Sequence, residues 1–317
     1  MSIIMNLDTL DSGVKAELQQ EIAKVRAEVS ERTHAKFYGV QVIVDDVLDL
    51  NGKMLRPLFT VIAAHFGTYD SEKMVKLAAS IEILHMATLI HDDIIDESKY
   101  RRHRESVQSR YGKDMAVYAG DYLLAKTLSI LDLETYDAKN IKRLVRVMTQ
   151  ICESELLQYQ NRKHVTSFKN YLRIVAGKTA ALFTTSMYVG AIESGCDERL
   201  ARLLGRIGYE LGVAFQIIDD ILDFSEDAST VGKSVRNDLK KGYYTLPVIY
   251  ALEGRQETDW TEDQIMLMME KAKGIERSRT LAKKYTKKAY RHIDALPDGV
   301  YKDAVRALAD FLVDRAY

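Results

Sequence analysis

The sequence has few of the residues that interrupt helices or cross-link chains. Only three prolines occur among its 317 residues, and because proline breaks a helix interior, their scarcity suits long helices. The two cysteines, Cys152 and Cys196, form no C-x-x-C pair, so neither a disulfide framework nor a zinc site is indicated. Isolated, reduced thiols fit a cytoplasmic protein best.

The chain also lacks a charge imbalance and a long uncharged stretch. Its 45 Lys and Arg residues oppose 46 Asp and Glu residues, for a net charge of −1. This balance excludes a global attraction to nucleic acid or to an anionic membrane. No uncharged apolar run approaches the roughly 18 residues of a membrane span. The N-terminus has no basic region before its short apolar run, so no signal peptide is predicted.

Helical periodicity is present throughout the chain instead. Apolar residues recur every three or four positions from the charged stretch 11–32 to the C-terminal stretch 259–317, as is typical of amphipathic helices. The sequence shows no low-complexity linker, no fixed-period repeat and no convincing series of alternating strands. These patterns predict an all-α fold formed by a single domain over residues 1–317.

Two D-D-x-x-D strings lie inside apolar stretches. Their members are Asp92, Asp93 and Asp96 in the first and Asp219, Asp220 and Asp223 in the second. On a helix, residues four apart share a face, so Asp92 lies near Asp96, and Asp219 near Asp223. Carboxylates in apolar surroundings cost free energy unless a cation or hydrogen-bond donors compensate for the burial. The two strings therefore predict one cavity with metal ions between facing acidic rims.

A third D-D-x-x-D string, Asp45, Asp46 and Asp49, has a different context. A string of this kind is weak evidence by itself, because helices commonly carry acidic residues on a solvated face. Here the neighbouring valines can pack inward while Asp45 and Asp49 face water. We therefore interpret this segment as an ordinary amphipathic helix and not as a metal site.

Calcium, di-iron and magnesium are the metals to weigh for the two aspartate clusters. Di-iron bundles need paired Glu-x-x-His motifs; Glu82 and His85 supply one, and the second cluster has none. Calcium loops place their ligands on alternate positions of a glycine-bearing loop rather than on a helix. Magnesium takes few protein carboxylates and completes its shell with water and substrate phosphates. The pattern favours magnesium.

Cations accompany the apolar stretches and raise the question of what they bind. They are Lys53, Arg56, Arg101, Arg102, Lys178 and Lys233. Taken singly, each has an ordinary interpretation: a connection between helices at 51–57, a surface charge run at 101–104, and a lysine that snorkels to solvent at 178. Taken together, they indicate phosphate ligands, and their apolar neighbours indicate a hydrocarbon chain. We therefore predict an apolar diphosphate bound in a helical barrel or bundle around a central cavity.

These motifs, in this order, resemble those of the trans-isoprenyl diphosphate synthases, or polyprenyl synthetases, over nearly the whole chain. Besides both aspartate motifs, the matching landmarks are Asn51-Gly52-Lys53-x-x-Arg56-Pro57, Glu82-x-x-His85, Arg101-Arg102, Gly177-Lys178-Thr179, Phe215-Gln216 and Gly232-Lys233. The resemblance is closest to the heptaprenyl-type catalytic subunits and implies the isoprenoid synthase fold. Departures from the family pattern occur at Asn51, Met54, His103 and Tyr243.

The resemblance also implies a mechanism and the roles of individual residues. Three Mg²⁺ ions would join the six motif aspartates to an allylic diphosphate, farnesyl or geranylgeranyl, with added charge from Arg101 and Lys178. Isopentenyl diphosphate would bind through Lys53, Arg56, His85 and Arg102, and Lys233 would complete the substrate contacts. Lys178, Thr179 and Gln216 would face the allylic cation. The departing diphosphate serves as the base in this family, so no His or Glu base is required.

Product length is predicted from the helix that precedes Asp92. The growing hydrocarbon should pass residues one turn or more earlier, and both Thr88 and Ala87 are small. An aromatic side chain there would close the path, and each helical turn of ~5.4 Å accommodates about one isoprene unit. A medium- or long-chain all-trans product, such as those used for quinone side chains, is therefore expected.

Three alternatives to a self-sufficient homodimer stay open. The chain could be a catalytic subunit that needs a second, smaller chain, as some heptaprenyl-type subunits do. It could be a terpene cyclase, although such enzymes usually carry an N-S-E-type second metal motif. It could also be a regulatory or structural subunit, in which loss of the aspartates would be expected; all six are present.

Overall fold

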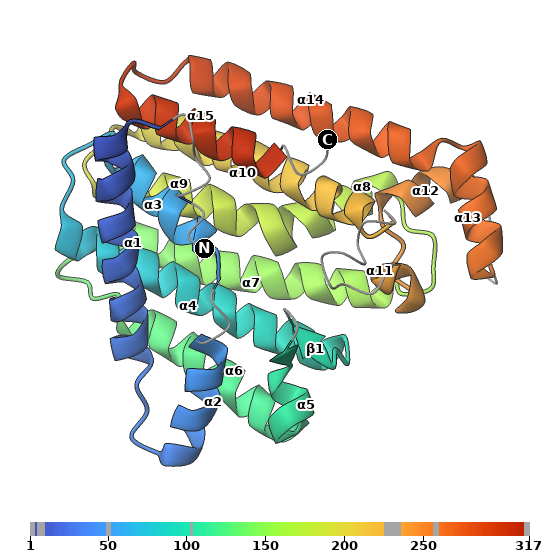
Figure 1. Cartoon of the computed structure of the whole chain (residues 1–317), viewed down its shortest axis with the longest axis horizontal. Helices are drawn as coiled ribbons and strands as arrows, with labels where there is room; N and C mark the ends of the chain where they lie inside the picture. The colour runs from blue at the N-terminus through green and yellow to red at the C-terminus, as the bar shows by residue number, and fades with distance from the viewer. Residues whose placement is uncertain are drawn as a thin grey trace. The chain divides into compact units, whose positions relative to one another are not determined.

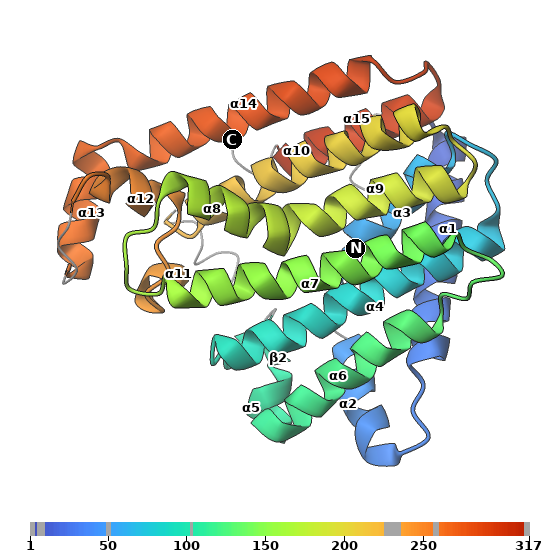
Figure 2. The ribbon, with the colours of Figure 1, turned by 180° about the vertical axis from the view of Figure 1, so that it is seen from behind.

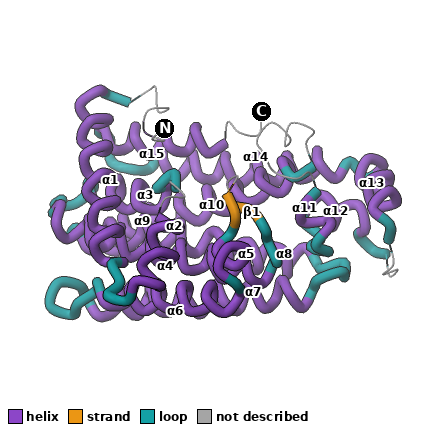
Figure 3. Tube along the Cα trace, turned by 60° about the horizontal axis from the view of Figure 1, so that its bottom comes forward, coloured by secondary structure: helices purple, strands orange, loops and turns teal. Residues whose placement is uncertain are grey.

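The structure, a computed structural model, describes residues 4, 10–48, 52–101, 104–224, 236–255 and 260–313. Nearly all of the described trace is helical (Figure 3). The strands found within these ranges are β1 (Tyr100–Arg101) and β2 (Arg104–Glu105), which pair antiparallel. The predicted all-α class is confirmed.

The chain divides into two compact units, each described here by itself. Unit 1 comprises Met1–Lys142, Ser186–Arg202 and Asp298–Val305, and unit 2 comprises Arg143–Thr185, Leu203–Pro297 and Arg306–Tyr317. Besides the strands, unit 1 contains α1 (Ser12–Thr33), α2 (Tyr38–Leu48), α3 (Leu55–Ala64), α4 (Ser71–Ile95), α5 (Val107–Tyr111) and α6 (Lys113–Ser129) (Figure 1). Unit 2 contains α8 (Phe168–Val175), the π-helix η2 (Ala176–Ala180), α11 (Asn237–Lys240), α12 (Leu246–Leu252), α13 (Glu262–Lys271) and α14 (Gly274–Asp294). Helices α7 (Ala138–Gln160), α9 (Ala181–Glu193), α10 (Glu198–Leu222) and α15 (Val300–Val313) contribute residues to both units. The prediction of a single domain stays a prediction.

Helix α4 is the centre of unit 1. It packs against α6, α1 and α3, and its neighbours α6 and α1 can be followed in Figure 2. Asp70 caps its N-terminus by accepting a hydrogen bond from the Lys73 N–H at 3.1 Å, and Glu72 complements the dipole in the first turn. By length and hydropathy α4 could span a membrane, but 67% of its most apolar window is buried inside the protein. We therefore interpret it as a core helix.

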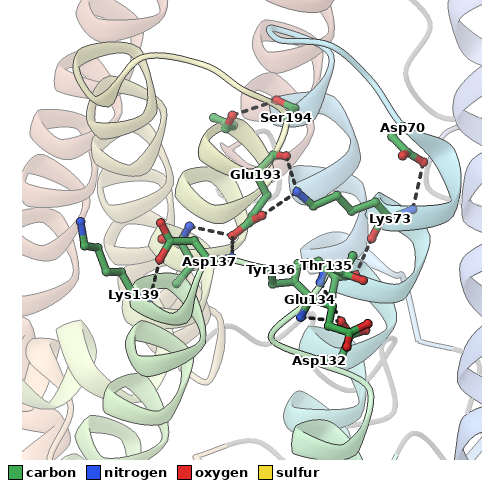
Figure 4. A network of polar contacts seen from close by, with 12 residues as sticks. Asp70, Lys73, Asp132, Glu134, Thr135, Tyr136, Asp137, Lys139, Glu193 and Ser194 are labelled. Atoms are coloured by element: carbon green, nitrogen blue, oxygen red, sulfur yellow. Dashed lines mark hydrogen bonds and ion pairs between the residues drawn. The ribbon is translucent and has the colours of Figure 1, made fainter.

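A polar network anchors the N-terminal end of α4 within unit 1 (Figure 4). Lys73 Nζ pairs with Glu193 Oε2 at 2.7 Å and donates to the Glu193 carbonyl at 2.9 Å. The other carboxylate oxygen of Glu193 accepts from Asn140 Nδ2 at 2.7 Å. Tyr136 donates its hydroxyl to the Lys73 carbonyl at 2.8 Å. Because the Glu193 side chain is only 4% exposed, these bonds are shielded from water and fix the start of α4.

The first two aspartates of the third D-D-x-x-D string lie on α2, and Asp46 docks that helix. Asp45 is exposed and accepts from Gln41 Nε2 at 2.6 Å, as expected of a residue that faces water. Asp46 instead accepts from Arg110 Nη1 at 2.7 Å and makes a short hydrogen bond with the Tyr111 hydroxyl. Asp46 thus ties α2 to α5. Asp49 lies outside the described residues.

Apolar side chains from five elements form the core of unit 2. Tyr171 of α8, Ala180 of η2, Ile217 of α10, Leu246 of α12 and Ala282 of α14 all belong to one buried cluster. This cluster packs around the part of α10 that carries the second aspartate string. The core therefore determines which of those aspartates are buried.

A largely buried imidazole lies beyond the end of α3 in unit 1, with its Nε2 atom 4.0 Å from Glu17 Oε1. The His65 ring stacks between Tyr69 and Tyr301, with ring centroids 3.8 and 4.0 Å away and interplanar angles of 9°. Its Nε2 atom is buried and has no hydrogen-bond partner. Burial lowers the pKa of His65 below its ordinary value of 6.5, although Glu17 and Glu21 oppose the shift.

We expect His65 to make the stability of the protein depend on pH. The unfolded chain binds a proton at His65 below about pH 6.5, whereas the folded chain resists it, so the free energy of unfolding should fall on acidification. His65→Phe keeps an aromatic ring in the stack and removes the titrating group. Urea denaturation at pH 7.5 and 5.5, to either side of about 6.5, should show a smaller loss of stability for this variant. Equal losses in both proteins would contradict the prediction.

Candidate functional site

The first aspartate string lies in the last turn of α4 and just beyond it, and its members differ in exposure. Asp92 and Asp96 are half-buried and share one face, whereas Asp93 is only 4% exposed. Residue 93 is rotated about 100° from residue 92 on a helix, which turns it toward the packed interior of unit 1. Of the three aspartates, only Asp92 and Asp96 are therefore partly exposed to solvent.

Asp93 is held by an arginine of the neighbouring strand pair. Arg101 donates Nε and Nη2 to the two Asp93 carboxylate oxygens, each at 2.7 Å. Burial raises the pKa of Asp93, and the guanidinium of Arg101 opposes this shift. A bidentate pair of this kind fixes both orientation and charge. Asp93 thus positions Arg101, one of the predicted phosphate ligands, while Arg102 and His103 lie outside the described residues.

Gln108 is a site residue that the sequence did not reveal. Its Nε2 donates to the Asp93 carbonyl at 2.7 Å and to the Ser98 carbonyl at 2.9 Å. Ser106 also donates its hydroxyl to the Ser98 carbonyl, at 2.5 Å. These bonds join the end of α4 to the strand pair that carries Arg101. A glutamine in the short helix α5 has no signal in the sequence, because its partners are main-chain atoms.

The predicted phosphate turn precedes α3 and has an unusual backbone. Met54, the N-cap of α3, has φ 53° and ψ 36°, a left-handed conformation uncommon outside glycine. Its side chain is 5% exposed, so burial stabilises the strained residue. Arg26 of α1 donates Nη2 to the Gly52 carbonyl at 2.9 Å. The flanking cations differ: Lys53 is exposed and Arg56 is half-buried.

A cavity of about 220 Å³ in unit 1 adjoins this turn. Its lining includes the predicted site residues His85, Asp93 and Arg101. Glu82, Met54 and several apolar residues of α1, α2 and α4 complete most of its wall. The predicted chain-length residues do not line it: Ala87 is fully buried, and Thr88 is half-buried and donates to the His85 carbonyl at 2.8 Å.

The second aspartate string, at the end of α10 in unit 2, has the same construction as the first. Asp219 and Asp223 are half-buried on one face, and Asp220 is 3% exposed. Asp220 accepts hydrogen bonds from the Tyr171 hydroxyl at 2.7 Å and from Gln216 Nε2 at 3.0 Å. Burial raises the pKa of Asp220 to about 8, although these two hydrogen bonds lower it. As in the first string, the middle aspartate is buried and held by hydrogen bonds from neighbouring side chains.

The hydrogen bonds of Asp220 continue to Thr179. The Gln216 side-chain carbonyl accepts from the Thr179 hydroxyl at 2.6 Å. Thr179, Gln216 and Asp220 therefore form one chain that ends at Tyr171. The structure thus brings together two of the three residues predicted to face the allylic cation.

Lys178 lies in the π-helix η2 between α8 and α9. A π-helical turn inserts a residue into the helix and redirects side chains, and such turns occur frequently at functional sites. Lys178 Nζ lies 2.8 Å from Glu155 Oε1 and 3.0 Å from Gln158 Oε1, both on α7. Its side chain is 27% exposed. The lysine is thus held by α7 rather than extended freely into solvent.

Glycine allows α7 to approach η2 closely. A Cβ atom on Gly177 would lie 1.8 Å from Ser154 Oγ and 3.0 Å from the Gln150 carbonyl oxygen. On the other side, a Cβ on Gly212 of α10 would lie 2.7 Å from the Ala180 Cα. The π-helix is therefore clamped between two helices, which fixes Lys178 and Thr179.

Asp223 also organises the chain that follows α10. Its two carboxylate oxygens accept from the backbone N–H groups of Asn237 at 3.0 Å and Asp238 at 3.2 Å. These bonds place the start of α11 beside the second aspartate string. The predicted ligand Lys233 lies in the segment 225–235, outside the described residues.

The carboxylates of the two aspartate strings fit magnesium better than a metal whose ligands all come from protein side chains. Within the described ranges, no three His, Cys, Asp or Glu side chains form a group that could hold a metal. Each unit instead supplies two half-buried aspartates that are four residues apart. Mg²⁺ suits such a set, because it takes few protein carboxylates and keeps oxygens from water and phosphate. That the two strings border one cavity stays a prediction.

Comparison with known proteins identifies the family. The polyprenyl synthetase profile matches residues 39–284. The chain is 33% identical over 283 residues to heptaprenyl diphosphate synthase component 2 of Bacillus subtilis, covering 86% of this chain and 81% of that protein. It is 30% identical over 314 residues to octaprenyl diphosphate synthase of Escherichia coli, covering 93% and 96%. The crystal structure of heptaprenyl diphosphate synthase from Staphylococcus aureus is similar with a TM-score of 0.88 and 30% identity, covering 95% of this chain and 99% of that one. The predicted isoprenoid synthase fold is thereby confirmed, and the chain belongs to the polyprenyl synthetase family.

Proposed function

We propose that this protein is a prenyltransferase that condenses isopentenyl diphosphate with an allylic diphosphate into an all-trans medium- or long-chain polyprenyl diphosphate. The observation that carries the proposal is the shared construction of the two aspartate strings. In each, the two outer aspartates are half-buried and the middle aspartate is buried and hydrogen-bonded by neighbouring side chains. Similarity to heptaprenyl and octaprenyl diphosphate synthases supports the product class.

The six aspartates form the proposed metal site for three Mg²⁺ ions. The half-buried aspartates Asp92, Asp96, Asp219 and Asp223 would bind the ions, and the buried aspartates Asp93 and Asp220 would support them. When bound, Mg²⁺ neutralises the charge that develops on the leaving diphosphate. Arg101, oriented by Asp93, and Lys178, oriented by Glu155, add fixed positive charge toward the same group.

The reaction breaks the allylic C–O bond, and its electron pair leaves with the diphosphate. The double bond of isopentenyl diphosphate then attacks the allylic carbon, so that a C–C bond forms and the positive charge moves to the isopentenyl unit. Loss of a proton to the departing diphosphate restores a double bond. Thr179 and Gln216 face the cation in this proposal, and Lys53, Arg56, His85 and Arg102 hold the isopentenyl diphosphate, with Lys233 as a further diphosphate contact.

Assembly and location are further parts of the proposal. A stripe on α7, formed by Val145, Thr149, Cys152, Leu156 and Tyr159, is exposed at the four- and three-residue spacing of a coiled-coil seam. Such an apolar stripe supports a homodimer.

The name "component 2" of the Bacillus relative supports the alternative, an enzyme that needs a second, smaller chain. We place the protein in the cytoplasm and its product in quinone side chains.

Prenyl transfer by the purified chain tests the function directly. The chain is incubated with Mg²⁺, labelled isopentenyl diphosphate, and farnesyl or geranylgeranyl diphosphate, and the products are separated by length. Incorporation into a linear product is expected. Incorporation only after a smaller partner is added would favour the heteromeric enzyme. A cyclic hydrocarbon formed from the allylic substrate alone would instead show a terpene cyclase.

We expect Ala87→Phe to shorten the product. Ala87 is fully buried on α4, and a phenyl ring at this position would close the predicted path of the growing chain. Because overpacking costs ~1–3 kcal/mol, thermal unfolding must first show that the variant is folded. Chromatography of the extracted products should then show chains shorter than those of the parent. Unchanged lengths in a folded variant would remove Ala87 from the tunnel.

A further inference from the structure

Helix α14 carries a concentrated positive charge that the proposed reaction does not use. Its basic face consists of Arg279, Lys283, Lys284, Lys287, Lys288 and Arg291. Five of these residues are exposed and Lys288 is half-buried. From Arg277 to Ile293 the sequence contains no Asp or Glu. No acidic residue of α14 itself therefore interrupts the face, which extends over about 18 Å of helix.

The geometry of α14 makes this face regular and outward. Arg279, Lys283, Lys287 and Arg291 are spaced four apart, so they follow one another along the helix surface. The opposite side, which includes Ser278, Ala282 and Ile293, is buried. Figures 1 and 2 show α14 as one long, straight orange helix. A straight helix with cations over half its circumference presents a convex surface, which suits a flat anionic partner better than a groove-bound one.

The rest of the chain has the opposite charge. Without the six residues of the basic face, 39 Lys and Arg residues oppose 46 Asp and Glu residues. The protein as a whole is therefore not attracted to polyanions, whereas the basic face of α14 concentrates six cations on one helix. Such an uneven distribution orients a molecule on an extended anionic surface, because other orientations bring acidic regions toward it.

We propose that the basic face of α14 is a contact surface for an anionic lipid membrane. Polybasic surfaces gain about fivefold in membrane partitioning for each cation near the headgroups. The apolar side of α14 is buried in the protein, so the contact is electrostatic and reversible rather than inserted. The biological reason for this contact rests on the proposed function. A polyprenyl diphosphate is an amphiphile whose hydrocarbon chain favours a bilayer over water.

Vesicle sedimentation of the full chain tests this proposal without any substrate. The vesicles contain phosphatidylcholine alone or with about one third phosphatidylglycerol, whose charge attracts polybasic surfaces. The test variant combines Arg279→Gln, Lys283→Gln, Lys287→Gln and Arg291→Gln. The control combines Lys36→Gln, Lys139→Gln, Lys142→Gln and Lys169→Gln, which changes the net charge equally at exposed positions outside α14. Glutamine is a good helix former, so both variants should fold, as circular dichroism will check.

We expect the parent to bind the anionic vesicles and to leave them at about 0.5 M salt, where charges are screened. The α14 variant should lose at least about tenfold in partitioning, and the control should stay within about twofold of the parent. No preference for anionic vesicles, or an equal loss in both variants, would overturn the proposal. Tighter binding of a DNA oligonucleotide than of vesicles at the same salt would also overturn it. Prenyl transfer measured in detergent without vesicles reports separately on the proposed function.

Discussion

Asp92→Ala is expected to lower the rate of prenyl transfer by at least about a thousandfold, the scale seen when groups that stabilise developing charge are removed. Asp92 and Asp96 are the half-buried aspartates of their string, so the loss of one would leave the proposed metal site incomplete. Asp219→Ala should have the same effect in the second string. Incorporation of labelled isopentenyl diphosphate, measured over a range of Mg²⁺ concentrations, provides the rates.

The third D-D-x-x-D string supplies the matched control. Asp45 is the first aspartate of the same D-D-x-x-D pattern, but it is exposed and bonded to Gln41 on its own helix. Asp45→Ala should therefore leave the rate nearly unchanged. Equal losses in Asp45→Ala and Asp92→Ala would show that our distinction between the strings is wrong.

Asp93→Asn should behave differently from Asp92→Ala. It removes the charge of the buried Asp93 that pairs with half-buried Arg101. Breaking a fully buried ion pair from one side costs about 3–5 kcal/mol, so a loss of stability up to this size is expected. Its main defect should appear in urea denaturation, whereas the defect of Asp92→Ala should appear in the Mg²⁺ dependence. Urea denaturation and the Mg²⁺ dependence of the rate therefore distinguish the buried Asp93, which holds Arg101, from Asp92, which is proposed to bind the metal.

Gly177→Ala should be damaging although the change is conservative. Alanine is intrinsically better than glycine in a helix by about 1 kcal/mol, so propensity alone predicts stabilisation. The new Cβ, however, would lie 1.8 Å from Ser154 Oγ, 2.8 Å from its Cβ and 3.0 Å from the Gln150 carbonyl oxygen. Overpacking of this kind costs ~1–3 kcal/mol. The steric cost exceeds the gain in propensity.

The effect on activity should exceed the effect on stability. To relieve the clash, η2 must move away from α7, and Lys178 would then lose its positions beside Glu155 and Gln158. A displacement of about 1 Å in a catalytic group can cost a hundredfold in rate, which steady-state assays of prenyl transfer will measure. Combining Gly177→Ala with Ser154→Gly removes the two closest contacts and should recover much of the loss. A double variant no better than Gly177→Ala would show that the clash is not the cause, and Ser154→Gly alone serves as the reference.

The sequence was sufficient for the class of fold and for the family. Helical periodicity, scarce proline and the ordered series of motifs are properties of short stretches, so they can be recognised without knowing how helices pack. The same holds for the aspartates of each string. What could not be predicted is that Asp93 and Asp220 are buried supports, because that depends on which side of α4 and α10 faces the core.

The other features that could not be predicted from the sequence depend on contacts between residues far apart in the chain. Lys178 had an ordinary interpretation as a lysine that reaches solvent, and only the packing of α7 against η2 shows its partners Glu155 and Gln158. The π-helix itself has no signature in the motif that it carries. Asp46 was grouped with residues of a solvated helix, yet it docks α2 through Arg110, a residue 64 positions away. These pairings become visible only when the chain is folded.

The side chain of Gln108 has a consequence for how relatives of this protein should vary. Both of its hydrogen bonds reach backbone carbonyls, those of Asp93 and Ser98, and every amino acid supplies a carbonyl. Position 98 can therefore change identity without breaking the link between α4 and the strand pair. Selection would act on position 108 alone, so an amide donor should persist there with no covarying partner, and contact inference from paired substitutions would not detect this link.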